Sequence, residues 1–172
     1  TLGLVEYQGS KENNIIPQEW QMTYSFEDPH EEDPARRFKG HVRAGTTTTP
    51  GMTLDLYYSR DERTWTPYEG NPIIDTSPRI RRWGPTRWMG WDPIREVYAV
   101  YMENSLHRRG PMGKRLIGRS ESVDAINYSD PETILVPDEH DSPDTEFYAF
   151  SVFAYEGMYV GLLRIFLTTN TT

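Results

Sequence analysis

Several arginines and two tryptophans lie close together in one short stretch of the chain, and this combination of side chains can bind a ligand. Residues 79–83 read Arg-Ile-Arg-Arg-Trp, and Arg87 and Trp88 follow. Guanidinium groups bind hydroxyls and carboxylates, and aromatic faces stack on sugar rings or on bases. The stretch favours a sugar or carboxylate ligand, with RNA or single-stranded nucleic acid as the alternative. A net charge of −8 argues against nucleic acid as the main partner, because phosphate binding needs clustered Lys and Arg.

A Ser-x-Asp motif with an aromatic residue four positions after the aspartate occurs twice, at 59–65 and at 122–128. Ser59 could be a nucleophile if it stood alone, but its repeat partner Ser122 makes a Ser-His-Asp interpretation poor. Ser and Asp side chains accept backbone N–H bonds two residues on, which closes a turn. We therefore expect two structural turns, each with its aromatic residue, Trp65 or Tyr128, packed between neighbouring units.

Metal-ligand patterns are weak in this sequence. The chain has no cysteine, and its four histidines are not paired at metal-ligand spacing. His140 lies in the sequence DEHDSPD, where a solvated acidic loop is favoured over a cation site. No metal site is predicted. The longest apolar stretch, MYVGLLRIF, is short and contains Arg164, so no membrane contact is predicted either.

The apolar segments are short, aromatic and β-branched, and turn residues separate them. Pro and Gly, 13 of each, leave few windows for a helix. Residues 54–59, 96–102 and 158–166 are typical of strands, and 147–155 with a turn at Glu156-Gly157 predicts a hairpin. The short segments NPII and ETIL follow the two Ser-x-Asp turns and predict further strands. The sequence therefore predicts an all-β protein.

The predicted strands repeat at a spacing of about sixty residues. Asp28-Pro29 recurs as Asp92-Pro93, and the next strands align through Phe38, Tyr98 and Tyr159. The order is strand, Asp-Pro turn, strand, long loop, strand, Ser-x-Asp turn, strand. A four-stranded antiparallel unit of this kind is typical of a β-propeller blade.

Two complete blades and one partial blade are predicted, at about 13–74, 75–137 and 144–172. Closed propellers need at least about four blades, so we expect an internal fragment of a larger, five-bladed propeller. Inner-strand residues such as Phe150 should then pack against missing blades. Contact with those blades, or self-association, is expected.

Four segments carry a resemblance to a known group: LGLVEYQGSKENNI, FEDP…RRFKG, YYSRDERTW and DTEFYAFSVFAYEGMYVGLL. Together they resemble the five-bladed β-propeller glycosidase superfamily of glycoside hydrolase families 32, 43, 62 and 68, over nearly the whole chain. The resemblance implies a funnel on the propeller axis with three carboxylates, each at the start of a different inner strand. It implies an oligosaccharide or glycoside substrate and no cofactor, although the channel could hold a structural cation.

Within this resemblance, Glu146 matches the general acid, because it directly precedes the inner strand of the last unit; the alternative is a solvated carboxylate at a strand start. Asp144 is its expected neighbour in substrate binding. Asp75 is the candidate for the carboxylate that tunes the acid, with a turn cap as the alternative. Three residues are expected at the funnel rim, in contact with the sugar: Arg81, Arg82 and Trp83.

The repeat of Asp28 at Asp92 places both aspartates at the opposite end of the strands from the funnel, so we interpret both as turn residues. The catalytic base should come from an earlier blade, outside this chain. The resemblance thus implies a fragment of a glycoside hydrolase that uses paired carboxylates and is inactive alone. The alternative is a non-catalytic propeller that binds glycans or proteins. An aspartate opening an earlier blade would favour the enzyme.

Overall fold

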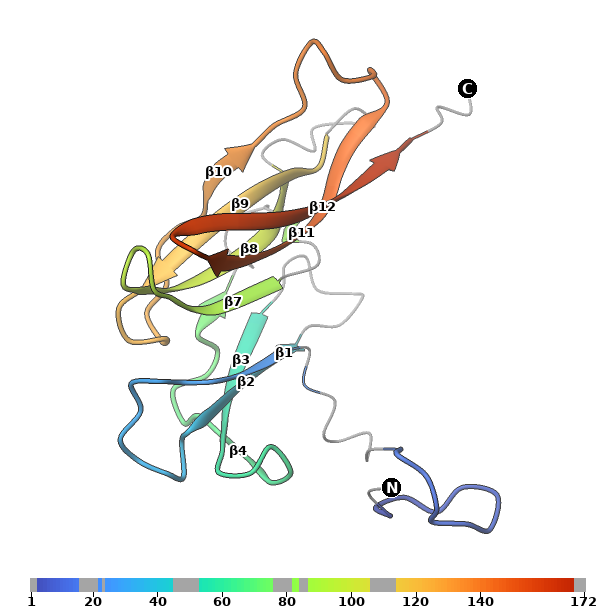
Figure 1. Cartoon of the computed structure of the whole chain (residues 1–172), viewed down its shortest axis with the longest axis vertical. Helices are drawn as coiled ribbons and strands as arrows, with labels where there is room; N and C mark the ends of the chain where they lie inside the picture. The colour runs from blue at the N-terminus through green and yellow to red at the C-terminus, as the bar shows by residue number, and fades with distance from the viewer. Residues whose placement is uncertain are drawn as a thin grey trace.

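The computed structural model describes residues 3–15, 22, 24–44, 53–75, 82–83, 87–105 and 114–168. Within these ranges all regular structure is β-strand and all strand pairs are antiparallel, which confirms the all-β prediction. The described strands form two five-stranded sheets and one hairpin, with no closed ring of sheets among them (Figure 1). None of the described segments is a helix long enough and apolar enough to cross a membrane.

Sheet 1 is a meander in which the first four strands follow one another in space in the same order as in the sequence. Its long central strand alternates buried and half-buried side chains, with Leu54 and Leu56 inside. This is the pattern of a strand with one face on the core. The strands of sheet 1 are β1 (Tyr24–Glu27), β2 (Phe38–Ala44), β3 (Thr53–Ser59), β4 (Trp65–Pro67) and β5 (Ile74–Asp75).

The last strand of sheet 1 differs from the predicted one. Two short strands, β4 and β5, pair with opposite ends of β3, instead of one strand over the segment NPII. The reason is Asn71, whose side chain fills the gap between them. Its Oδ1 accepts from the Leu56 N–H at 2.8 Å, and its Nδ2 donates to the Leu56 carbonyl at 2.9 Å. The amide thus replaces one residue of a strand.

Sheet 2 repeats the path of sheet 1, in the order β10-β9-β8, with β6 and β7 both on the remaining edge of β8. Its strands are β6 (Arg82–Trp83), β7 (Arg87–Asp92), β8 (Val97–Ser105), β9 (Leu116–Ser122) and β10 (Glu132–Leu135). The register repeats too, because Phe38 lies opposite Ser59 in sheet 1 and Tyr98 opposite Ser122 in sheet 2.

The C-terminal hairpin consists of β11 (Thr145–Tyr155) and β12 (Met158–Leu167). Its two-residue turn is Glu156-Gly157, as predicted, with both residues at positive φ. Type I′ hairpin turns require positive φ at both central residues, and glycine adopts it without strain.

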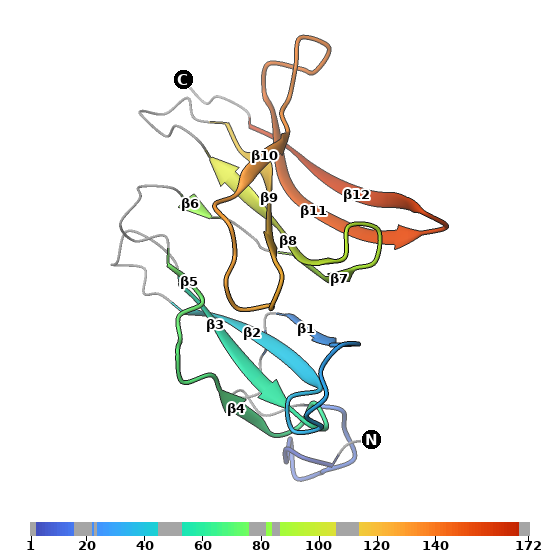
Figure 2. The same cartoon turned by 90° about the vertical axis from the view of Figure 1, so that its left-hand side faces the viewer.

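Sheet 2 packs against sheet 1 on one face and against the hairpin on the other (Figure 2). Successive residues of β8 point to opposite faces: Val100 and Met102 join Leu54 and Ile74 of sheet 1, whereas Ala99 and Tyr101 join Phe147 of the hairpin. The expectation that Phe150 faces missing blades is wrong, because its ring packs on Tyr101 with centroids 5.7 Å apart.

Both Ser-x-Asp motifs are structural turns, as predicted. The Asp61 carboxylate accepts the N–H groups of Arg63 and Thr64, and the Asp124 carboxylate accepts those of Ile126 and Asn127. Although burial opposes it, the hydrogen bonds from Asn127 and from the Ser122 hydroxyl lower the pKa of Asp124 to about 2. Backbone hydrogen bonds from Thr64 and Arg63 also lower the pKa of Asp61, so both turns favour the ionised carboxylate.

The aromatic residues of the two motifs differ in place and in neighbours, because Trp65 begins β4 whereas Tyr128 lies between β9 and β10. Tyr128 packs against the cluster shared by sheets 1 and 2, as predicted. Trp65 instead covers Gly40 of its own sheet, where a Cβ would lie only 2.6 Å from the indole ring. Only the first of these two contacts joins neighbouring sheets among the described residues.

Candidate functional site

The two Asp-Pro turns are built by their aspartate side chains, which confirms the interpretation of Asp28 and Asp92 as turn residues. Asp28 accepts the His30 N–H at 3.0 Å, and Asp92 accepts the Ile94 N–H at 3.0 Å. Such side-chain bonds to the backbone two residues on are the usual role of aspartate in turns.

Each of these aspartates also accepts a tyrosine hydroxyl from the next unit of the chain. The Tyr98 hydroxyl donates to Asp28 at 2.7 Å, across a separation of 70 residues. The Tyr159 hydroxyl donates to Asp92 at 2.8 Å, across 67 residues. We call these two contacts the junction bonds. Sheet 1 is thereby tied to sheet 2, and sheet 2 to the hairpin, by the same chemistry at equivalent positions.

A buried cation completes each junction. Lys39 binds Asp28 at 2.5 Å and Arg119 binds Asp92 at 2.5 Å, and each cation is less than 10 % exposed. Burial acts in the opposite direction, but these cations and the donated hydrogen bonds hold the pKa of Asp28 and the pKa of Asp92 below the ordinary value. Burial and the bond to Asp92 raise the pKa of Tyr159 to about 12, so its hydroxyl keeps its proton.

A groove of about 380 Å³ lies beside the first junction, between the two Asp-Pro turns. Its walls combine aromatic rings, prolines and one carboxylate; they are formed by Phe26, Glu27, Pro29, Trp91 and Pro93. The Trp91 ring also makes an edge contact with His30, with centroids 4.1 Å apart. Glu27 is held by an ion pair with Arg37 at the surface.

The predicted acid, Glu146, lies at the other end of β11 from the hairpin turn and is 7 % exposed. Its carboxylate forms an ion pair with Arg115, whose guanidinium also binds Glu103 of β8 at 3.4 Å. The Arg115 guanidinium lies 5.7 Å from the ring centroid of Tyr148 and 5.5 Å from that of Phe166. We call these five residues the Arg115 cluster.

The local sequence explains how the Arg115 cluster is assembled. Arg115 directly precedes β9, and its carbonyl accepts the Phe147 N–H at 3.0 Å, which fixes the start of β11 beside it. Residues 103 and 117 are partners in the β8–β9 ladder, so Glu103 lies beside the same end of sheet 2. Glu146, Tyr148 and Phe166 come from the hairpin. Glu146 lies opposite Phe166 in the ladder, and Tyr148, at the register shift between 147 and 149, has its ring centroid 6.0 Å from that of Phe166.

The other predicted site residues are placed as follows. Asp144 precedes β11 and its carbonyl accepts the Thr168 N–H at 3.0 Å, and its role beside Glu146 stays a prediction. Asp75 is an exposed residue of β5, opposite Thr53 in sheet 1. The backbone of β6, Arg82 and Trp83, lies opposite residues 105 and 104 of β8, next to Glu103. Arg81 lies outside the described residues.

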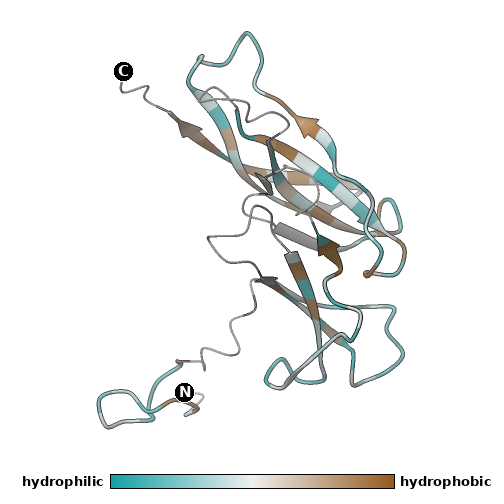
Figure 3. Cartoon of the chain, turned by 180° about the vertical axis from the view of Figure 1, so that it is seen from behind, coloured by the Kyte–Doolittle hydropathy of each residue, from teal (hydrophilic) through white to brown (hydrophobic). Residues whose placement is uncertain are grey.

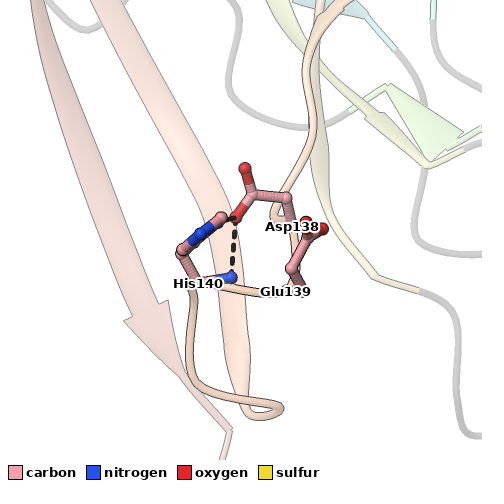
Figure 4. A group of neighbouring side chains, drawn as sticks. All are labelled: Asp138, Glu139 and His140. Carbon is pink, nitrogen blue, oxygen red and sulfur yellow. Dashed lines mark hydrogen bonds and ion pairs between the residues drawn. The ribbon is translucent and has the colours of Figure 1, made fainter.

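The acidic loop before the hairpin brings Asp138, Glu139 and His140 together, and each could offer one metal ligand (Figure 4). All three side chains are exposed. The contacts within the loop are those of a turn, in which the His140 N–H donates to Asp138 at 2.9 Å. Exposed acidic groups of this kind are common in proteins without a metal, and nothing else in the described residues points to an ion here.

Sequence reasoning named Glu146 as a candidate but named neither of the residues that join it in the cluster, Arg115 and Glu103. The signal for Glu103 was the single charged residue of β8, at a position that continues the inward alternation of Ala99 and Tyr101. Such a residue needs a buried partner of opposite charge. The partner, Arg115, lies just before β9 and outside any strand, so strand periodicity carries no signal for it.

Comparisons of the chain with protein-family models, with curated proteins and with solved structures find no match. The resemblance to glycosidase propellers therefore depends on the quoted motifs alone.

Proposed function

We propose that this chain is part of a carbohydrate-active β-propeller of the glycoside hydrolase type, with the Arg115 cluster at its sugar-binding site. The observation that carries the proposal is the pair of buried carboxylates, Glu103 and Glu146, which come from neighbouring units and bind one guanidinium beside two aromatic rings. Glycoside hydrolysis needs two carboxylates on separate rigid supports, and β8 and β11 supply such supports.

The separation of the two carboxylates is compatible with this chemistry. Both bind nitrogens of the Arg115 guanidinium, so their separation does not exceed the roughly 9.5 Å that inverting glycosidases use. Tyr148 is half-buried and Phe166 is 46 % exposed, so both rings have surface for stacking on a sugar. Glu146 is the group that meets the glycosidic oxygen, and Arg115 orients both carboxylates and the sugar hydroxyls.

The propeller part of the proposal is supported by the repeated path of sheets 1 and 2 and by the repeated junction bonds. Each sheet stacks on the next through the same pair of side chains, as blades of a propeller do around an axis. Glu146 and the backbone of β6 then lie at one end of the blades and the Asp-Pro turns at the other.

Binding of the purified chain to an oligosaccharide array tests the proposal. We expect one class of glycans to bind, and binding to fall at least about tenfold in Tyr148→Ala and in Glu146→Gln, because each removes a sugar contact. Glu139→Gln, an exposed carboxylate in the loop before the hairpin, is the matched control and should bind as the unmodified chain does. An array on which no glycan binds, or binding that survives both variants, would contradict the proposal.

A specific observation favours a second candidate, a non-catalytic propeller that binds glycans. The Glu146 carboxylate is 7 % exposed and already paired with the Arg115 guanidinium, so it has a structural partner within the cluster. Hydrolysis separates the two candidates. If the longer propeller that contains this segment binds a glycan through the Arg115 cluster but never releases a reducing sugar from it, the non-catalytic function holds.

A further inference from the structure

The outer edge of β12 is open along its ten residues. Within the part of the chain that the structure describes, β12 pairs with β11 only. Its counterparts in the two sheets have neighbours on both sides: β2 lies between β1 and β3, and β8 lies between β7 and β9. The strand near the C-terminus is predominantly apolar in Figure 3, and Arg164 is its single charged residue.

Two observations show that β12 is the counterpart of β8. Tyr159 donates to Asp92 of the preceding sheet just as Tyr98 donates to Asp28. The strand registers agree, because Tyr98 is the second residue of β8 and Tyr159 the second residue of β12, and each is paired with the strand before it. The neighbour missing from β12 is therefore the counterpart of β3 and β9.

The exposed surface of the hairpin is unusually apolar for one that faces water. Leu162 is 68 % exposed, Met158 and Leu167 are each 61 % exposed, and Phe153 on β11 is 50 % exposed. Proteins protect long edge strands with charges, prolines or bulges, because an open edge pairs with other chains. β12 has none of these features apart from Arg164, so we expect another strand to pair with its outer edge.

We propose that the open edge of β12 binds an extended polypeptide segment from outside residues 1–172, antiparallel to β12 and in the register of β9. In both sheets the residue opposite the Tyr98 position is a serine that begins a Ser-x-Asp turn. The segment should therefore present such a serine opposite Tyr159, with alternating apolar residues before it. This inference depends on the repeat and not on the proposed carbohydrate function.

A second copy of this chain is a poorer occupant. Its β3 and β9, which lead into the Ser-x-Asp turns, are already paired on both edges within their own sheets. The edge strands that it could offer, such as β1, β10 or another β12, contain no Ser-x-Asp motif to place opposite Tyr159. Pairing of two β12 strands in a dimer would therefore overturn the proposal.

Hydrogen exchange with a defined peptide tests the proposal on the chain as it exists. The probe is a synthetic peptide of residues 114–129, which contains β9 and its turn, and the control is the same composition in reversed order. In an antiparallel ladder alternate N–H groups point to each edge, so every second amide of β12 faces the incoming strand. We expect the peptide to slow exchange of those amides at least about tenfold and the reversed peptide to have no effect.

Two matched variants localise the effect. Leu162→Lys places a charge on the apolar hairpin surface and should weaken peptide binding at least about fivefold, since it opposes the net positive peptide and removes apolar contact. Val123→Lys, at a residue 83 % exposed in the turn of sheet 2, should leave binding unchanged. The proposal is overturned if the peptide leaves β12 exchange unaltered, if the reversed peptide protects equally, or if sedimentation shows a dimer with β12 already protected.

Discussion

The hydroxyl of Tyr98 lies 2.7 Å from the carboxylate of Asp28, and the hydroxyl of Tyr159 repeats this contact on Asp92 at 2.8 Å. Both aspartates are buried and both also form their own Asp-Pro turn. One carboxylate thus joins a turn, a buried cation and the next unit of the chain. The stacking of the sheets depends on two tyrosines as well as on apolar packing.

Removal of one junction hydroxyl should destabilise the fold measurably. Tyr98→Phe leaves the ring in place but removes a hydrogen bond to a buried charged group, which is worth about 1.5–3 kcal/mol. Urea unfolding should show a lower midpoint with an unchanged slope. Tyr155→Phe is the control, because that ring is 60 % exposed, and its free energy of unfolding should change by less than about 0.5 kcal/mol. Equal stability of both variants would show that the junction bond contributes nothing.

Neutralising the aspartate of the second junction should lower the free energy of unfolding by more than Tyr98→Phe does. Asp92→Asn leaves the buried Arg119 guanidinium without its closest carboxylate, and an uncompensated buried charge typically costs about 3–5 kcal/mol. Glu121, which also binds Arg119, should keep the loss near the lower end of that range. Asp138→Asn, an exposed carboxylate, serves as the control. A loss below about 1 kcal/mol by calorimetry would mean that Arg119 is satisfied without Asp92.

Acid should destabilise the protein through His41. Burial, with a smaller contribution from the Lys39 charge, lowers the pKa of His41 to about 3 from an ordinary value of 6.5. Below pH 6.5 the unfolded chain therefore binds a proton that the folded chain does not bind until about pH 3. The free energy of unfolding should fall with decreasing pH across this window, by up to about 1.4 kcal/mol per pH unit.

His41→Gln should flatten this pH dependence between about pH 6.5 and 4.5, above the range in which the carboxylates lose their charge. The lowered pKa values of Asp28, Asp92 and Asp124 contribute stability above about pH 4 that is lost in stronger acid. The loss of stability caused by protonating these aspartates remains in His41→Gln and appears at the low-pH end of the stability–pH curve. His140→Gln, at an exposed histidine, should keep the full slope. An unchanged slope in His41→Gln would assign the acid sensitivity to another group.

Sequence patterns were sufficient for most of the strands and turns. Alternation along 54–59 and 96–102, and the short run 158–166, correspond to β3, β8 and β12 with shifts of a few residues at the ends. These features are local, because each depends on residues that are neighbours in the chain. The fourth strand of sheet 1 was mispredicted because a side chain, that of Asn71, takes the place of backbone there.

The same sequence patterns could not predict contacts between residues that are far apart in the chain. The motif repeat identified Asp28 as a turn residue, but its tyrosine partner lies 70 residues away and a tyrosine in a strand is unremarkable. Position alone identified Glu146, whereas its ion pair with Arg115 depends on how the hairpin packs on sheet 2. Pairings of this kind need the three-dimensional arrangement or a set of related sequences.

Within the Arg115 cluster, the losses of stability caused by removing the cation and by removing one carboxylate should not be additive. Arg115→Gln leaves Glu103 and Glu146 buried without their shared partner, which should cost about 3 kcal/mol. The double variant Arg115→Gln/Glu146→Gln should be less destabilised than the sum of the two single variants, because the three groups interact. Chemical unfolding of all four proteins gives the comparison. Strict additivity would mean that the three side chains do not form one cluster.

The central claim is that successive units of this chain are joined by the same tyrosine–aspartate bond. A double-mutant cycle at the first junction, with Tyr98→Phe, Asp28→Asn and the double variant, tests it most directly, because the coupling energy isolates that one contact. We predict a coupling of about 1 kcal/mol or more in the free energy of unfolding, since bonds to a charged acceptor are roughly twice as strong as neutral ones. Tyr159→Phe combined with Asp28→Asn, a mismatched pair, should be additive within about 0.5 kcal/mol. Additivity at the matched pair would contradict the claim.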